Sequence, residues 1–224
     1  MPSPTRLLNE VESKALLHSA GVPVIPTELA RTPAEARSLA ARLGCPAAIK
    51  IVSPDIAHKS EVGGVRLHLD TPAAVETAAA AMLRSVQQSQ PAARLTGVAV
   101  QPMAPAGGVE VIVGVKRDPQ FGPVIMFGLG GVLVEAFDDV VCRLVPIGVR
   151  DARQMLGEIR GARVLHGARG RAAVDLAKLE ALLHAVSALV AQRSDILELD
   201  LNPVMAFASR AVAVDARMLL GEDA

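Results

Sequence analysis

The chain has 224 residues, a length that fits one large domain or two small ones. Hydrophobic residues make up 51% of the sequence and charged residues 21%. This composition is sufficient to form a packed apolar core and excludes intrinsic disorder. Lys and Arg together number 23, as do Asp and Glu, so the formal net charge is zero; this argues against a nucleic-acid partner. Trp and Tyr are absent, which argues against sites that stack bases or sugars on aromatic rings.

The sequence predicts a cytoplasmic protein that neither enters nor binds a membrane. The N-terminus lacks the apolar run of a signal peptide. Charges interrupt each apolar stretch before it reaches the roughly 18 residues that a membrane span needs. Cys45 and Cys142 each stand beside apolar residues, and we interpret them as buried, reduced thiols.

The first half of the chain alternates predicted helices and strands. Thr32 and Thr71 each precede a proline, a pattern typical of helix starts, with the threonine as N-cap. The predicted elements are a helix over 7–20, a strand over 22–30, a helix from Thr32 to Leu43, strands over 47–52 and 65–69, and a helix from Thr71 to about Gln88.

The second half is richer in strands, and the composition around residue 95 suggests a boundary between two α+β lobes, 1–95 and 96–224. Alternating apolar residues predict most of its strands, and leucines and valines at helical spacing predict a long helix. The predicted elements are strands over 97–102, 109–116, 123–127 and 132–145, helices over 151–160 and 175–191, and strands over 195–201, 203–207 and 211–215.

The segment Leu-Glu-Leu-Asp-Leu-Asn near the C-terminus carries a candidate metal site. Period-2 alternation puts its leucines on one strand face and Glu198, Asp200 and Asn202 on the other. Oxygen ligands suit Mg²⁺, and Asp215 at the end of the next predicted strand supplies a facing carboxylate. Pro203 restricts the direction of Asn202. The alternative is a solvated strand face on an open sheet.

Lys50 lies in the apolar strand Ala-Ala-Ile-Lys-Ile-Val, where its ammonium needs an anionic partner. A phosphate group fits, and the alternatives are a structural salt bridge or a lysine that reaches solvent. The loop that follows combines His58, Lys59, Gly63 and Gly64. Paired glycines let backbone N–H groups approach an anion, and histidine accepts phosphoryl groups or shuttles protons.

Two further loops are weaker signals. The Pro/Gly loop from Gln101 to Glu110 links two predicted strands and suits a hinge that reads an adenine edge. The glycine cluster over 127–135 fits a bulge or a tight turn equally well. It is not the dinucleotide fingerprint, and no Walker A sequence occurs in the chain.

Taken together, these segments resemble the ATP-grasp domain of ADP-forming acyl-CoA synthetases, which are related to the succinyl-CoA synthetase β subunit. The resemblance covers about residues 7–219. Its most specific segments are ESKALLHSAGVPV, AIKIVSPDIAHKSEVGGV, VGVKRDPQFGPVIMFGLGGVLVE, GARG at 167–170 and ELDLNPV.

The resemblance implies an α+β ATP-grasp fold in which two lobes with mainly antiparallel sheets enclose a site for ATP or ADP with Mg²⁺. It implies one role for each group of candidate residues: Lys50 with Lys59, Gly63 and Gly64 at the phosphates, Gln101, Pro102 and Met103 at the adenine, Glu110 near the ribose or phosphates, and Asn202, Asp215 and Asp200 at the metal.

The resemblance further implies that His58 carries a phosphoryl group between a partner ligase domain and ADP, with acyl-CoA, ADP and phosphate converted to acid, CoA and ATP. The CoA-binding and ligase domains do not fit in 224 residues, so we expect a CoA-binding α subunit or domain as partner, in a hetero-oligomer. The alternatives are a regulatory nucleotide-binding module and a stand-alone ATP-dependent carboxylate ligase.

Overall fold

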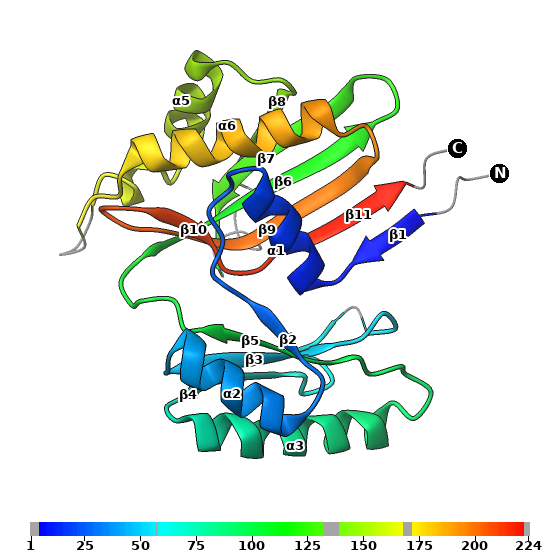
Figure 1. Cartoon of the computed structure of the whole chain (residues 1–224). Helices are drawn as coiled ribbons and strands as arrows, with labels where there is room; N and C mark the ends of the chain where they lie inside the picture. The colour runs from blue at the N-terminus through cyan, green and yellow to red at the C-terminus, as the bar shows by residue number, and fades with distance from the viewer. Residues whose placement is uncertain (1–4, 57, 132–138, 168–171, 222–224) are drawn as a thin grey trace. The chain divides into compact units, whose positions relative to one another are not determined.

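The computed structural model of the chain describes residues 5–56, 58–131, 139–167 and 172–221 (Figure 1). The contacts of the chain divide it into two compact units, each of which combines segments that are distant in sequence. The large unit comprises residues 1–8, 13–24 and 105–224, and the small unit comprises residues 9–12 and 25–104. Each unit has its own sheet and its own apolar core.

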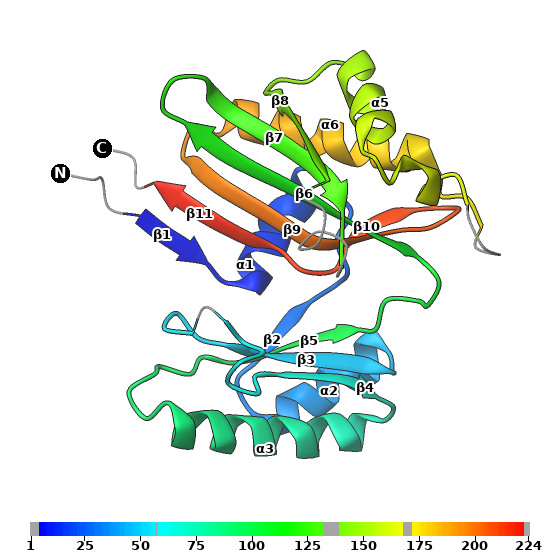
Figure 2. The same cartoon turned by 180° about the vertical axis from the view of Figure 1, so that it is seen from behind.

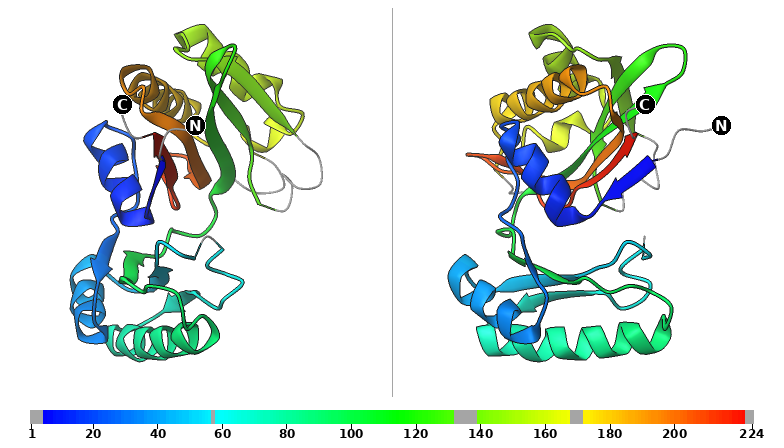
Figure 3. Two further views of the ribbon diagram at one scale, coloured as in Figure 1. Left: turned by 90° about the vertical axis from the view of Figure 1, so that its right-hand side faces the viewer. Right: turned by 45° about the vertical axis from the view of Figure 1, so that its right-hand side comes forward.

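The small unit is a four-stranded antiparallel sheet with strand order β2-β5-β3-β4, covered on one face by two helices (Figures 1 and 3). Both helices begin as predicted, because the hydroxyls of Thr32 and Thr71 accept hydrogen bonds from backbone N–H groups of the first turn. The elements are β2 (Glu28–Ala30), α2 (Pro33–Leu43), β3 (Ala47–Val52), β4 (Val65–Leu69), α3 (Pro72–Ser89) and β5 (Gly97–Pro102).

The large unit has a seven-stranded sheet with the order β1-β11-β9-β6-β7-β8, and β10 pairs with β9 beside β11; the pairings are antiparallel. Its elements are β1 (Thr5–Leu8), α1 (Glu10–Ser19), β6 (Val109–Asp118), β7 (Gly122–Leu129), β8 (Val140–Leu144), α5 (Val149–Glu158), the short helix η1 (Ala162–Val164), α6 (Leu176–Gln192), β9 (Ile196–Ala206), β10 (Ala211–Ala213) and β11 (Arg217–Gly221). The first turn of α1 groups with the small unit.

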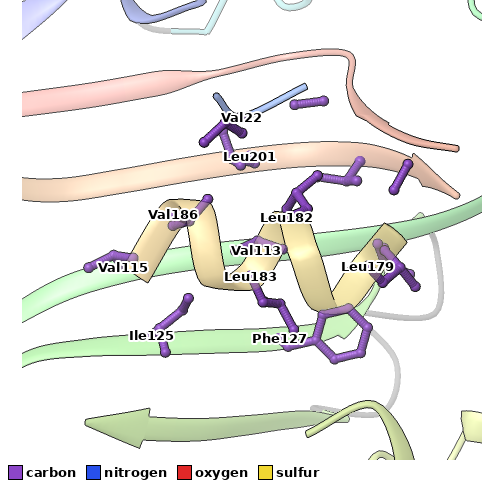
Figure 4. Packing of buried hydrophobic residues seen from close by; sticks show 14 of the residues in the cluster. Val22, Val113, Val115, Ile125, Phe127, Leu179, Leu182, Leu183, Val186 and Leu201 are labelled. Atoms are coloured by element: carbon purple, nitrogen blue, oxygen red, sulfur yellow. The ribbon is translucent and has the colours of Figure 1, made fainter. Parts of the chain in front are cut away.

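Helix α6 packs its apolar side on the central strands of the large sheet. Figure 4 shows Leu179, Leu182 and Leu183 of this helix against Val113 of β6 and Phe127 of β7, and these residues are buried. In the view from behind, the strands β6, β9 and β11 lie in front of α6, so the helix covers one face of the sheet (Figure 2). In β9, Leu199 and Leu201 belong to the buried core, and alternation turns Asp200 and Asn202 to the opposite face.

The structure differs from the sequence prediction at both ends of the chain. The helix predicted over 7–20 begins at Glu10, because Thr5–Leu8 form the strand β1. This strand pairs with the C-terminal strand β11, and neither of the two strands was predicted. The predicted strand over 22–30 reduces to β2. The two strands predicted over 195–207 are one strand, β9, while residues 132–138 of the predicted strand 132–145 lie outside the described residues.

The division of the chain into two units also differs from the predicted single boundary near residue 95. Strand β5, at residues 97–102, pairs with β3 and so belongs to the small unit. Strand β1 pairs with β11 and so belongs to the large unit. Both assignments rest on strand pairings between distant segments, which local composition does not reveal.

The two cysteines are exposed, in contrast to the prediction. Cys142 follows Val141 in β8, and strand alternation turns the two side chains to opposite faces of the sheet. Val141 packs against the core, which leaves Cys142 on the face away from it. Cys45 directly precedes the buried strand β3. No helix in the described ranges is long and apolar enough to cross a membrane.

Candidate functional site

Lys50 lies in the middle of β3, where the side chains of all six residues are buried. Its Nζ donates a hydrogen bond to Glu10 Oε1 at 2.7 Å, and the two side chains are 8% and 1% exposed. The anionic partner predicted for this lysine is therefore present in the chain as a carboxylate. The ion pair fits the salt-bridge alternative and leaves open a second role for Lys50 at a phosphate.

Glu10 is a residue that the sequence analysis missed. Its second carboxylate oxygen, Oε2, accepts a hydrogen bond from Lys59 Nζ at 2.9 Å, so one carboxylate bridges two lysines of the small unit. One negative charge between two positive charges leaves a net positive charge, which attracts anions. In the sequence, Glu10 is an acidic residue in the first turn of a helix, a position common for reasons of helix stability alone.

The loop that carries His58 is packed down onto β3. Gly64 N–H donates to the carbonyl oxygen of Lys59, and its own carbonyl accepts from Ile51 N–H, both at 2.7 Å. A Cβ atom at Gly64 would lie 2.5 Å from Ile51 Cγ2 and 2.8 Å from Lys59 O, so this close approach requires glycine. Gly63 has a φ of 69°, which also favours glycine. The loop thus holds Lys59 beside Glu10 while His58 is exposed.

The predicted adenine hinge lies at the end of β5. Gln101 is buried, and its side-chain oxygen accepts a hydrogen bond from the Thr27 hydroxyl at 3.1 Å. Met103 N–H donates to the carbonyl oxygen of Pro46 at 2.8 Å, and Pro102 has no N–H group. Adenine recognition at 101–103 would therefore rely on groups other than the Met103 amide while that bond holds.

The predicted alternation of the metal strand is confirmed in the large unit. In β9, Leu199 and Leu201 are buried, whereas Asp200 and Asn202 are exposed on the other face. The register with β6 then shifts, since Asn202 and Pro203 together stand opposite one residue of that strand. Such a bulge re-aims a strand and accommodates proline, which lacks the ladder N–H.

Asp215 lies between β10 and β11, which pair with successive parts of β9. Val214 N–H donates to the Pro203 carbonyl at 2.9 Å, which brings the residue before Asp215 to the bulge. The pKa of Asp200 is raised, first because its carboxyl group is partly removed from water and second because of the negative charge of Asp215; the charge of Arg217 opposes both.

The side chains of Asp200, Asn202 and Asp215 fit a magnesium site in their chemistry. Each offers at least one oxygen ligand, and a cation would relieve the repulsion between the two carboxylates. Within the described part of the chain, no group of three or more His, Cys, Asp and Glu side chains gathers as a metal cage. Mg²⁺ usually keeps several waters and is bound through one or two carboxylates, so such a cage is not required.

Glu110 lies on β6 and is exposed. Its carbonyl accepts a hydrogen bond from Gly130 N–H at 2.7 Å, and a Cβ atom at Gly131 would lie 2.9 Å from Glu110 Oε2. The described part of the glycine cluster therefore allows a close approach to Glu110. Glu135 and residues 168–170 of the predicted GARG loop lie outside the described residues.

A cavity of about 390 Å³ opens on the face of the large sheet that carries Asp200. Val124 and Met126 are among its apolar lining residues, and Lys116 and Arg217 contribute cationic groups beside it. Asp200 thus stands at the border between the candidate metal site and a hollow large enough for a small ligand. The sequence offered no signal for this hollow because its lining comes from β6, β7, β8, β9 and β11.

Comparisons with known proteins agree with the predicted family. The sequence model of the ATP-grasp domain family matches residues 2–220. Acetate–CoA ligase (ADP-forming) I of Archaeoglobus fulgidus is 46% identical over 212 residues, which cover 95% of this chain and 31% of that protein. Subunit beta of acetate–CoA ligase (ADP-forming) I of Pyrococcus furiosus is 41% identical, and the match covers 96% of this chain and 92% of that subunit.

The fold is also similar to solved structures of acetyl-coenzyme A synthetase 1 from Candidatus Korarchaeum cryptofilum. The complex with coenzyme A, Ca-AMPCP and HgCl⁺ has a TM-score of 0.93 at 40% identity, covering 96% of this chain and 93% of that one. The complex with coenzyme A and Mg-AMPPCP has a TM-score of 0.84 at 38% identity, covering 96% and 92%, and its phosphohistidine segment points towards the nucleotide binding site.

Proposed function

This chain belongs to the ATP-grasp domain family, and on that premise we propose that it is the nucleotide-binding part of an ADP-forming acyl-CoA synthetase. In this role it passes a phosphoryl group between ADP or ATP and a partner that holds the CoA-binding and ligase domains. The net reaction converts acyl-CoA, ADP and phosphate to carboxylic acid, CoA and ATP.

The observation that carries this proposal is the extent of the likeness to a separate subunit. The chain spans about a third of the length of the Archaeoglobus relative, but nearly all of the Pyrococcus subunit beta. The longer relative extends well beyond the part that this chain matches. A CoA-binding α subunit or domain is therefore the proposed partner, and a hetero-oligomer the proposed assembly. Because the reaction uses ADP, phosphate and CoA, we place it in the cytoplasm.

We assign the candidate residues within each unit by their chemistry. In the small unit, Lys50 and Lys59 supply positive charge for the phosphates. In the large unit, Asn202 and Asp215 would hold Mg²⁺, with Asp200 beside them. The metal neutralises negative charge on the phosphate oxygens when it is bound. Gln101, Pro102 and Met103 remain the proposed neighbours of the adenine, and Glu110 of the ribose or phosphates.

His58 is the proposed phosphoryl carrier. A neutral imidazole nitrogen of His58 attacks the phosphorus of the incoming phosphohistidine, so one N–P bond forms as the other breaks. A β-phosphate oxygen of ADP then attacks the phosphorus, which forms the O–P bond of ATP and releases the imidazole. His58 is suited to this exchange because it is exposed on a loop that neighbouring bonds hold in place.

The reverse half-reaction tests this role without the partner. Wild-type chain is incubated with Mg²⁺ and ATP labelled in the γ-phosphate, and we expect an acid-labile, base-stable label on the protein. His58→Ala should lose the label and retain ADP binding, whereas His18→Ala, at an exposed position of α1, should retain both. Label that persists in the His58→Ala variant would contradict the carrier role.

The two alternatives make different predictions in the same assays. A regulatory module would bind nucleotide without transferring the label, and a stand-alone carboxylate ligase would hydrolyse ATP in step with ligation in the absence of CoA. No contact among the described residues favours either of them. The synthetase proposal is preferred because the Pyrococcus subunit beta is comparable in length to this chain and 41% identical to it.

A further inference from the structure

The bridging carboxylate of Glu10 stands between the two cations proposed to hold phosphate. Its two oxygens take one ammonium each, Lys50 Nζ at 2.7 Å and Lys59 Nζ at 2.9 Å. The side chain of Glu10 is 1% exposed, so this carboxylate is held out of water by the fold. A buried carboxylate is retained at a cost in desolvation unless cations compensate it, and here two cations do so.

The bridge also joins the His58 loop to the central strand of the small sheet. Lys50 belongs to β3, whereas Lys59 directly follows His58 in the chain. Lys59 is 25% exposed at its side chain and is therefore the more accessible of the two lysines. Its backbone carbonyl accepts the Gly64 hydrogen bond, so Lys59 also holds the Gly64 end of the loop.

An incoming phosphate group would accept hydrogen bonds from the same two lysines that now donate to Glu10. Phosphate oxygens form charge-assisted hydrogen bonds with ammonium groups, as the carboxylate does. The negative charge of Glu10 repels the phosphate, and Glu10 occupies one of the three N–H donors of each ammonium. Anion binding at Lys50 and the Glu10–Lys59 bond are therefore coupled with opposite signs.

We propose that Glu10 is a positioning residue that occupies the phosphate-binding lysines in the nucleotide-free protein and holds the His58 loop in place through Lys59. Phosphate binding at Lys50 weakens this bridge and releases Lys59, which allows His58 to move between phosphoryl donor and acceptor. This inference rests on the proposed function, because it takes Lys50 to be a phosphate ligand.

Hydrogen exchange on the wild-type chain tests the release. The amides of Gly63 and Gly64 donate within the loop, and Gly64 reports directly on the backbone of Lys59. We expect their exchange to become faster when saturating ADP is added, whereas ordinary ligand binding slows exchange near the site. Slower or unchanged exchange at these amides with ADP bound would overturn the proposal.

The variant Glu10→Gln tests the competition. It keeps the size of the side chain and removes its charge, so we expect the Kd for ADP to fall at least about fivefold. Glu61→Gln, at an exposed position of the same loop, is the matched control and should leave the Kd within about twofold. A purely structural role predicts the opposite change for Glu10→Gln, namely weaker binding because the lysines lose their common anchor.

The outcomes separate this inference from the proposed function. A wild-type chain that does not bind ADP contradicts the proposed function itself. ADP binding by the wild type, with an unchanged or higher Kd in Glu10→Gln, overturns the role of Glu10 alone. If Glu10→Gln fails to fold, the exchange experiment on the wild-type chain still decides, since it needs no substitution.

Discussion

Lys14 Nζ donates a 2.6 Å hydrogen bond to the backbone carbonyl of Val214, a residue 200 positions away in the sequence. Lys14 is 2% exposed, and Val214 directly precedes the proposed metal ligand Asp215. The same helix thus contributes Glu10 to the lysine bridge and, four residues later, Lys14 to a hydrogen bond with the backbone next to the proposed ligand Asp215. A lysine so deeply buried is rare unless polar groups accept hydrogen bonds from its ammonium group.

We predict that Lys14→Met destabilises the large unit and weakens the metal dependence of nucleotide binding. The Val214 carbonyl loses a charged donor, which lowers the free energy of unfolding by about 1–3 kcal/mol. Denaturant unfolding measures this loss, and titration of ADP with and without Mg²⁺ measures the second effect. Lys178→Met, at an exposed position of α6, is the control. Equal stability of the two variants would show that the Val214 bond contributes nothing.

Gly64→Ala tests how closely the His58 loop must approach β3. The added Cβ meets Ile51 Cγ2 and the Lys59 carbonyl at distances below 3.0 Å, so the loop has to shift. We expect a loss of about 1–3 kcal/mol in the free energy of unfolding, together with slower labelling of His58.

The control for Gly64→Ala is Gly157→Ala in α5, where a Cβ atom meets nothing within 4 Å. Gly157 is the penultimate residue of α5, so alanine there should raise stability by no more than about 0.5–1 kcal/mol. Undiminished labelling of His58 in Gly64→Ala would mean that the loop tolerates displacement. Chemical denaturation and the ATP labelling assay supply the two measurements.

Asp200→Asn should raise stability at neutral pH in the absence of Mg²⁺. The pKa of Asp200 is raised in the folded chain, so folding favours the protonated form and the ionised form is destabilising above that pKa. The gain from asparagine should shrink as the pH falls through the folded pKa and vanish below the unfolded value of about 3.9.

Thermal melts of wild type and Asp200→Asn between pH 7 and pH 3.5 measure this difference. Added Mg²⁺ should also reduce it, because a cation compensates the two carboxylates. Glu198→Gln, two residues away on the same face of β9, is the control. A destabilised Asp200→Asn variant at pH 7 without Mg²⁺ would contradict the repulsion between Asp200 and Asp215.

Asp55 anchors the start of the His58 loop to Arg94. Its carboxylate accepts three hydrogen bonds from Arg94, one from the backbone N–H at 2.7 Å, one from Nε at 3.0 Å and one from Nη2 at 2.7 Å. These bonds lower the pKa of Asp55 to about 2. A lowered pKa contributes stability above the unfolded value, and this contribution disappears as the pH falls towards 2.

Asp55→Asn should therefore lower the Tm at pH 7, and the difference from wild type should close as the pH falls from about 4 towards 2. High salt should reduce the difference at pH 7, since the pair is exposed. Asp70→Asn, at another exposed position of the small unit, is the control. A difference in Tm that persists at pH 2 would show that the carboxylate charge is not its source.

Local sequence was sufficient to predict most helices and strands. Thr32 and Thr71 cap the helices that they predict, because a hydroxyl that accepts from the first-turn N–H groups needs only neighbours in sequence. The alternation in β9 likewise places Asp200 and Asn202 away from the buried leucines. The family resemblance, which the comparisons confirm, rests on such short ordered segments.

The ion partners and the grouping of strands required the tertiary structure. Glu10 meets Lys50 and Lys59 across 40 and 49 residues of sequence, and no periodicity relates them. The pairing of β1 with β11, which moves the N-terminal residues into the large unit, spans almost the whole chain.

Length and composition established a folded chain with zero net charge and bounded the chemistry that it contains. Propensity, capping and alternation depend on neighbouring residues, so the sequence by itself determined the helices and most strands, and it suggested which residues to propose as phosphate and metal ligands. Which charges meet depends on where distant segments are brought together by burial and strand pairing. Only the tertiary structure therefore decided that one buried carboxylate, Glu10, holds both lysines that the sequence had assigned to phosphate.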